Sequence, residues 1–118
     1  MKNEIFSQLQ ELHVAAWNEK DVTTRDEILK KIYSEDIKMY DKEFTFDGLR
    51  AVSDFIGKLI SEDHLFNFSA ARPIESLQNG ARLFGHIQTG GGLLNSMDFF
   101  LVEDNKVKHL YAFIEPAN

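Results

Sequence analysis

The sequence predicts one α+β domain, in which three N-terminal helices pack against a cone-shaped, curved antiparallel sheet and enclose a pocket. Two observations predict this class. Helical periodicity marks three segments of the chain up to about residue 60, with a short hairpin before the third, and long strand-like segments fill the rest. Turn sequences such as Gly90-Gly91-Gly92 separate those strands and suit hairpins. Helices segregated from strands define the α+β class, and a curved sheet under helices often keeps an apolar pocket.

The composition fits a single domain spanning residues 1–118. With 118 residues, 43% hydrophobic and 12% aromatic, one core should bury roughly two thirds of the unfolded surface. A formal net charge of −6 without a Lys/Arg run argues against nucleic acid and anionic membranes as partners. The chain has no cysteine and no apolar run like a signal peptide or membrane span, so we expect a cytoplasmic protein.

The first helix is expected from Glu4 to about Lys20. Its apolar positions recur at three- and four-residue steps, and Phe6, Leu9, His13 and Trp17 form one row along it. His13 therefore points toward whatever the helix covers, or it lies half-exposed at the edge of the apolar stripe. Both interpretations are open at this point.

A second helix is expected after Thr24-Arg25-Asp26-Glu27, which has the spacing of a capping box, and it should carry Tyr33 among its apolar residues. A short strand follows, in which Ile37, Met39 and Asp41 share one face. Asp41 either faces the pocket or starts the turn into the next strand, a role that aspartate often fills.

The return strand is Phe44-Thr45-Phe46, and Asp47 is expected to cap a third helix from Leu49 to Ile60. Four long strands should complete the domain. These are residues 64–74, 80–89, 93–103 and 106–114.

Asp98 lies in the middle of an apolar strand. Burying a carboxylate costs several kcal/mol or raises its pKa, so Asp98 is either exposed or part of a cavity that uses it.

This order of elements, with three local stretches, resembles the nuclear transport factor 2-like superfamily, particularly its ketosteroid isomerase and SnoaL-like members. The stretches are His13 to Asp21, Ile37 to Asp41 followed by Phe46-Asp47-Gly48, and Met97 to Phe100. The resemblance covers nearly the whole chain. It implies a pocket for a small hydrophobic molecule and isomerase or cyclase chemistry that moves a proton next to a carbonyl.

In ketosteroid isomerase an aspartate base moves the proton, while a tyrosine and a neutral aspartic acid hydrogen-bond the enolate. The resemblance implies Asp41 as the base, Asp98 as the protonated donor, and His13 where the tyrosine would be. The histidine departs from the pattern, and Ile56 replaces a supporting tyrosine. His13 could instead pair with Asp41 or Asp98 and hold that carboxylate ionised, which would leave Asp98 as a base or as an orienting group.

Further pocket residues are expected among the large side chains of the helices and strands, although regularly spaced aromatic residues are often plain core. His86 joins them if its strand face points inward. The candidates are Trp17, Phe55, Phe84, His86, Phe100 and Ile114. The four histidines show no metal-ligand spacing, so neither a metal nor a cofactor is expected.

Apolar residues on both faces of the last strands predict a homodimer formed through the sheet. Two functional hypotheses follow from the sequence. One is an enzyme that transfers a proton on a small apolar carbonyl compound. The other is a non-catalytic domain of the same fold that binds a ligand or dimerises.

Overall fold

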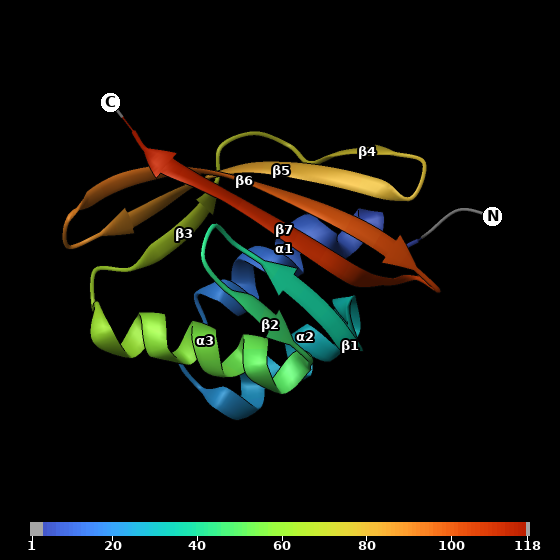
Figure 1. Ribbon diagram of the computed structural model, residues 1–118, viewed down its shortest axis with the longest axis horizontal. Helices are drawn as coiled ribbons and strands as arrows, with labels where there is room; N and C mark the ends of the chain where they lie inside the picture. The colour runs from blue at the N-terminus through green and yellow to red at the C-terminus, as the bar shows by residue number, and fades with distance from the viewer. Residues whose placement is uncertain (1–3, 118) are drawn as a thin grey trace.

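The computed structural model describes residues 4–117. Within them the chain forms three helices and seven strands, with the first two strands lying between the second and third helices (Figure 1). The elements are α1 Phe6–Trp17, α2 Val22–Ile32, β1 Tyr33–Tyr40, β2 Thr45–Asp47, α3 Leu49–Glu62, β3 Asn67–Ala70, β4 Glu75–Leu77, β5 Gly80–Thr89, β6 Gly92–Glu103 and β7 Lys106–Pro116.

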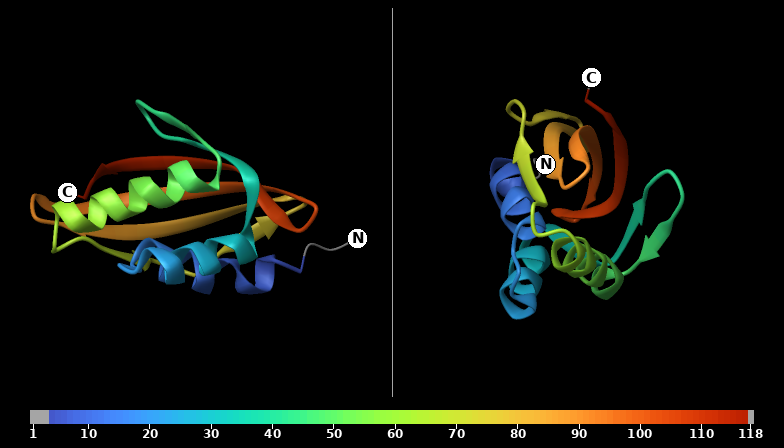
Figure 2. Two further views of the ribbon diagram at one scale, coloured as in Figure 1. Left: turned by 90° about the horizontal axis from the view of Figure 1, so that it is seen from below. Right: turned by 90° about the vertical axis from the view of Figure 1, so that its left-hand side faces the viewer.

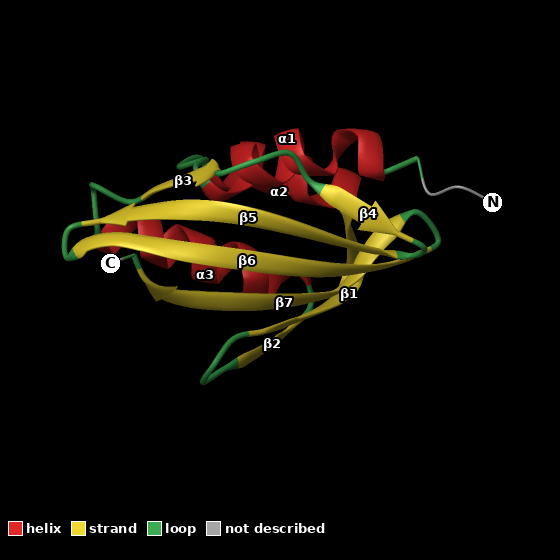
Figure 3. Ribbon diagram, turned by 90° about the horizontal axis from the view of Figure 1, so that it is seen from above, coloured by secondary structure: helices red, strands yellow, loops and turns green. Residues whose placement is uncertain are grey.

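The strands form one curved, unclosed sheet in the order β2-β1-β7-β6-β5-β3, with β4 paired to β5 (Figure 3). All neighbours are antiparallel except β1 and β7, which are parallel. Figure 2 shows the helices together on one side of the curved sheet. The predicted α+β class is therefore confirmed, with one difference: the sheet is mixed, because β1 joins β7 after a crossover through α3 and the meander.

The predicted strand over residues 64–74 is shorter in the structure. β3 ends at Ala70 and β4 begins only at Glu75. Pro73 lies in the interruption, where it has no N–H to give to a ladder. The amide of Ile74 donates instead to Gln10 Oε1 on α1, at 2.9 Å. This bond ties the break in the strand to the first helix.

Two predicted helix caps were wrong. α2 begins one turn earlier than expected, with Asp21 as its N-cap, and the Asp21 carboxylate accepts from the Thr24 amide at 2.9 Å. Gly48, with φ of 93°, is the N-cap of α3, and Asp47 instead pairs with Lys38 across the β1–β2 hairpin. The cap of α2 was misplaced by three residues and that of α3 by one, at helix ends where periodicity is least informative.

The core lies between the helices and the inner face of the sheet. α1 buries Leu9, His13, Ala16 and Trp17, which lie on one face. On β6 the alternate residues from Ser96 to Val102 are buried, so Asp98 faces the helices. The helix side of the sheet is called the inner face below, and the opposite side the outer face.

Asn18 fixes the end of α1 against the sheet. Its side-chain amide donates to the Phe68 carbonyl at 2.7 Å and accepts from the Phe68 amide at 2.8 Å. At the other end, the Ile5 amide donates to Asn105 Oδ1 at 2.9 Å. Asn105 belongs to the β6–β7 turn and has positive φ, which asparagine tolerates. α1 is therefore held over the inner face at both ends.

Among residues 4–117, no helix is both long enough and apolar enough to span a bilayer.

Candidate functional site

A cavity of about 180 Å³ lies on the inner face, between α1, α3 and the sheet. Its walls are mostly apolar and aromatic, and Asp98 contributes a carboxylate from β6. The lining residues are Trp17, Met39, Asp41, Phe55, Leu59, Asp63, Phe66, Phe68, Ile87, Thr89, Leu94, Asp98, Ala112 and Ile114. The volume is below the roughly 300–1,000 Å³ typical of sites for drug-sized ligands, so it suits a small molecule.

Behind Asp98, a chain of buried hydrogen bonds runs into the helices. His13 Nε2 lies 3.0 Å from Asp98 Oδ2, and His13 Nδ1 lies 2.7 Å from the hydroxyl of Tyr33. The Trp17 indole N–H donates to the same hydroxyl at 2.9 Å. His13 and Tyr33 are each 1% exposed and Asp98 is 7% exposed. Asp98 is thus linked through His13 to Tyr33, at the start of β1, and through Tyr33 to Trp17.

The donor properties of these groups fix the direction of the chain. An indole N–H can only donate, so the Tyr33 oxygen accepts from Trp17. Burial raises the pKa of Tyr33 well above 10.0, so its hydroxyl keeps its proton. Its partner for that proton, among the described residues, is His13 Nδ1. Nδ1 is therefore the acceptor nitrogen, and Nε2–H donates to Asp98.

This direction leaves His13 neutral and Asp98 an acceptor. A second proton on His13 would leave the Tyr33 hydroxyl without a partner, which costs about 1–3 kcal/mol for a buried group. Of the roles considered for Asp98, this bonding pattern shows one, that of hydrogen-bond acceptor for His13. Oδ2 accepts from His13, while Asp98 also lines the cavity.

Aromatic rings hold His13 in place. Phe100 and Phe68 meet the imidazole edge-on, with ring centroids 4.9 and 5.5 Å away. Phe100 is fully buried and does not line the cavity, so its observed role is to support His13.

Asp41 and Asp63 lie at the rim of the cavity and are only partly buried. Asp41 Oδ1 accepts from the amides of Glu43 and Phe44, so Asp41 starts the β1–β2 turn and lines the cavity as well. Asp63 accepts from the Gly90 and Leu65 amides, and these bonds lower the pKa of its carboxyl. Both carboxylates are already supplied with backbone donors.

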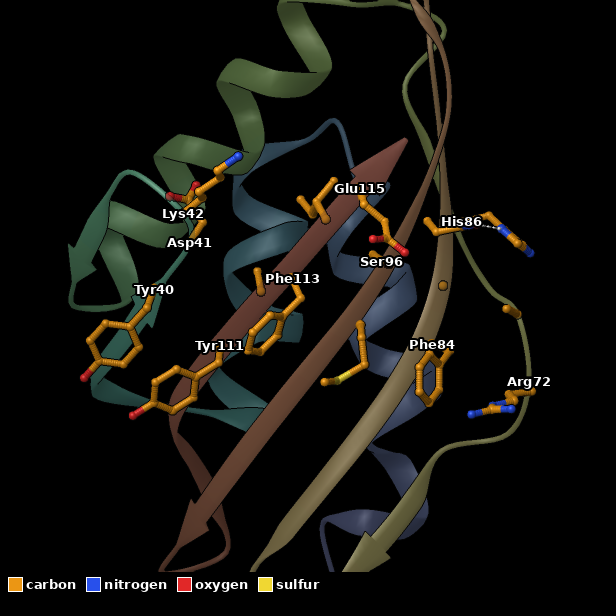
Figure 4. A pocket seen from close by; sticks show the side chains of 16 residues that line it. Tyr40, Asp41, Lys42, Arg72, Phe84, His86, Ser96, Tyr111, Phe113 and Glu115 are labelled. Atoms are coloured by element: carbon orange, nitrogen blue, oxygen red, sulfur yellow. Dashed lines mark hydrogen bonds between the residues drawn. The ribbon is translucent and has the colours of Figure 1, made fainter. Parts of the chain in front are cut away.

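A second hollow, of about 850 Å³, lies on the outer face (Figure 4). Tyr111 and Phe113 project into it from β7, and Tyr40 stacks on Tyr111 with centroids 4.6 Å apart. Phe84 faces the same side and carries Arg72 over its ring, 4.0 Å from the centroid. This outer hollow is larger than the inner cavity and more open to solvent, and the described residues that line it form no chain of buried hydrogen bonds like that behind Asp98.

Apart from Phe100, the structure separates the predicted pocket residues into three groups. Trp17 and Phe55 line the inner cavity, and Ile114 borders both hollows. Phe84 and His86 line the outer hollow, because Gly85 and Ile87 take the inner positions of β5. Among the expected catalytic residues, His13 meets Asp98, while Asp41 lies apart at the rim.

Sequence reasoning missed Tyr33, Phe66 and Phe68. Tyr33 was assigned to the apolar face of α2, but the helix ends at Ile32 and Tyr33 begins β1. The available signal was chemical: buried histidine and tryptophan nitrogens each need a partner, and a tyrosine at a helix–strand junction can supply one. Among residues 4–117, no three His, Asp or Glu side chains cluster as a metal site.

Neither a protein-family model nor a curated protein matches the chain. Solved structures do. A candidate isomerase of the SnoaL-like family from Agrobacterium tumefaciens superposes with a TM-score of 0.83 at 16% identity, covering 94% of this chain and 97% of that one. A candidate ketosteroid isomerase from Kribbella flavida gives 0.78 at 15% identity, with 98% and 81% covered.

A third match is a protein of ketosteroid isomerase-like fold from Catenulispora acidiphila, solved in complex with trimethylamine. Its TM-score is 0.73 at 9% identity, with 95% and 85% of the two chains covered. The chain has the nuclear transport factor 2-like fold. This confirms the resemblance seen in the sequence, at the level of the fold. Folds of this kind carry unrelated functions, so the function is argued from the inner cavity.

Proposed function

We propose that this nuclear transport factor 2-like protein binds a small, largely apolar molecule in the inner cavity. The observation that carries the proposal is the cavity itself, whose aromatic and aliphatic walls lead to a single buried carboxylate held by His13. A concave apolar site with few convergent polar groups is the usual form of a small-molecule site. A buried chain of four polar side chains is a costly feature for packing alone.

The hydrogen bonds behind Asp98 make the site rigid before any ligand arrives. His13 is bonded at both ring nitrogens and wedged between rings, so it holds Asp98 Oδ2 in one position. Preorganised groups bind with less loss of conformational entropy. Binding to Asp98 should therefore cost little reorganisation.

Two substitutions on β6 test which hollow is used. Leu94 lines the inner cavity and Met97 lines the outer hollow, so Leu94→Phe and Met97→Phe each fill one space on the same strand. Thermal-shift and calorimetric screening of small apolar compounds should find ligands for wild type and Met97→Phe, and lose them in Leu94→Phe. Ligands lost only in Met97→Phe would contradict the inner site.

A second candidate function is proton transfer next to a carbonyl, with Asp98 and Asp41 as candidate bases and His13 as the group that orients Asp98. It is favoured by one observation, the Asp98 carboxyl group that lines the apolar cavity and is held in place by His13. Against it, the Trp17 and His13 N–H groups are already donated within the protein, and the Thr89 hydroxyl donates to the Gly92 carbonyl. An enolate oxygen would lack a ready donor.

Turnover of a carbonyl compound distinguishes proton transfer from ligand binding alone. A panel of enones and β-keto compounds should be tested with wild type, Asp98→Asn and Asp41→Asn. Loss of turnover in Asp98→Asn alone would make Asp98 the base, and loss in Asp41→Asn would make Asp41 the base. Binding without turnover in wild type would leave the non-catalytic function.

A further inference from the structure

The inner cavity has acidic and aromatic walls and no cationic ones. Asp98, Asp41 and Asp63 are its carboxylates, and none of the described residues that line it is Lys, Arg or His. Its aromatic side chains, from α1, α3, β3 and the segment before β3, are Trp17, Phe55, Phe66 and Phe68. Trp17 and Phe55 meet edge-to-face, with centroids 6.2 Å apart.

The charge of Asp98 has no counter-ion within the described part of the chain. His13 lies at ion-pair distance, but in the hydrogen-bond direction argued above its Nδ1 accepts from the Tyr33 hydroxyl, and that tautomer of the imidazole carries no charge. A carboxylate that is 7% exposed and faces an apolar cavity is costly unless it is paired. The missing positive charge can come from a ligand.

We propose that the ligand of the inner cavity is a small organic ammonium ion, with an N–H on the Asp98 carboxylate and its alkyl groups against the aromatic walls. The inference rests on the proposed binding function and names the class of its ligand. Carboxylates with aromatic faces are the usual surroundings of bound ammonium groups, because each ring face is electron-rich. A neutral compound would leave the carboxylate unpaired, and an anion would meet it with like charge.

A bare metal ion fits these walls poorly. One carboxylate in the depth of an apolar cavity supplies too few oxygen ligands for a hard cation, and the other two carboxylates lie at the rim bonded to backbone amides. An alkylammonium ion needs only one strong acceptor and otherwise apolar contact.

Three probes of one shape test the proposal: cyclohexylamine, which is an ammonium ion at pH 7, cyclohexanol and cyclohexanecarboxylate. Calorimetry at low salt and the fluorescence of Trp17, the single tryptophan of the chain, report binding. Wild type should bind the ammonium about tenfold or more tighter than the alcohol, and should not bind the carboxylate.

Substitutions test whether the preference for the ammonium ion comes from the Asp98 carboxylate. Asp98→Asn should lower ammonium affinity to that of the alcohol and leave alcohol affinity unchanged, because asparagine can still accept from His13. Asp36→Asn is the matched control, since Asp36 is exposed, pairs with Lys108 and lies outside the cavity. It should change no affinity by more than about twofold. Phe55→Leu should weaken the ammonium more than the alcohol, because only the cation uses the ring face.

If Asp98→Asn does not fold, the three probes tested on wild type alone decide whether the ligand is a cation. Alcohol or carboxylate binding as tightly as the ammonium would overturn the cationic ligand and leave the binding function standing. Failure of all three probes to bind would overturn the binding function together with this inference.

Discussion

At the scale of single residues, the site depends on where three protons lie. Trp17 donates to Tyr33, Tyr33 to His13, and His13 to Asp98. Each group in this chain satisfies the next, so removing Tyr33 or His13 leaves buried polar atoms unpaired on both sides. Tyr33 is the member that lets His13 stay neutral, although it does not touch the cavity.

Tyr33→Phe should destabilise the protein by about 1–3 kcal/mol, because it leaves the Trp17 N–H and His13 Nδ1 without partners. Urea unfolding followed by Trp17 fluorescence measures the loss. Tyr40→Phe is the control: it also removes a tyrosine–histidine bond, to His109, but at a partly exposed position, and should cost below about 0.5 kcal/mol. Equal losses in the two variants would contradict a special role for Tyr33.

The same tyrosine predicts an alkaline effect. Burial raises the pKa of Tyr33 well above 10.0, so the folded state keeps a proton that the unfolded chain releases. The contribution of the Tyr33 hydroxyl to the free energy of unfolding is complete below about pH 10, and it is lost as the pH rises toward the pKa of the folded state. The gap in unfolding free energy between wild type and Tyr33→Phe should therefore narrow above about pH 10. A gap that is constant from pH 8 to 11 would disagree with a buried, protonated hydroxyl.

His13 and Asp98 could be singled out from the sequence because each is a polar residue in an apolar row. Their pairing is consistent with one of the alternatives left open there. Tyr33 could not be found by periodicity, since its partner His13 lies 20 residues earlier and the helix–strand boundary falls at Tyr33 itself. A contact between distant segments is set by tertiary packing.

At the scale of elements, α2 and α3 are locked by a second buried polar group. Arg25 is 3% exposed, and its guanidinium donates to Ser53 Oγ at 3.0 Å and to the Glu19 carbonyl at 2.7 Å. Gly57 on α3 leaves the room for it, because a Cβ there would lie 2.8 Å from the Arg25 Nη2 atom. α3 in turn forms one wall of the inner cavity.

Gly57→Ala should therefore destabilise the protein, although alanine favours a helix by about 1 kcal/mol over glycine. The hydrogen bonds of Arg25 prevent an easy retreat of its side chain, and overpacking typically costs about 1–3 kcal/mol. Ser61→Ala, at an exposed position of the same helix, is the control and should be neutral or slightly stabilising. Thermal unfolding of both variants checks this, and a stabilised Gly57→Ala would show that Arg25 moves freely.

The elements themselves were largely predictable from period and turn chemistry, including the three helices and the β5–β7 meander. Their ends were not, as the caps at Asp21 and Gly48 show. The parallel pairing of β1 with β7 was also missed, because residues 33–40 and 107–111 are joined only by tertiary structure. The sequence also could not predict that Phe84 and His86 lie outside the inner cavity. Both faces of the β5 strand are apolar, so either face could have pointed inward.

At the scale of the whole molecule, the outer face of the sheet exposes apolar side chains. Phe113 is 57% exposed there, beside Tyr111 and the outer hollow. Exposed apolar patches of this kind often mark contacts between proteins. We propose that two copies pair through this face, which would also close the outer hollow.

Phe113→Lys should weaken such a dimer by placing two like charges near its centre. Light scattering over a concentration series should show wild type approaching twice the mass of one chain and Phe113→Lys remaining near one. A conservative Phe113→Leu should stay dimeric. A wild type that is monomeric at every concentration would rule out the pairing.

The inner cavity remains the feature on which the proposed function depends. Its most direct test is an NMR titration of wild type with cyclohexylamine at pH 7, because Trp17 gives the single indole N–H signal of the chain and lines this cavity. We predict a saturable shift of that signal, absent in Leu94→Phe. A stationary indole signal, with shifts confined to amides of the outer face such as Met97 and Phe113, would contradict the inner site.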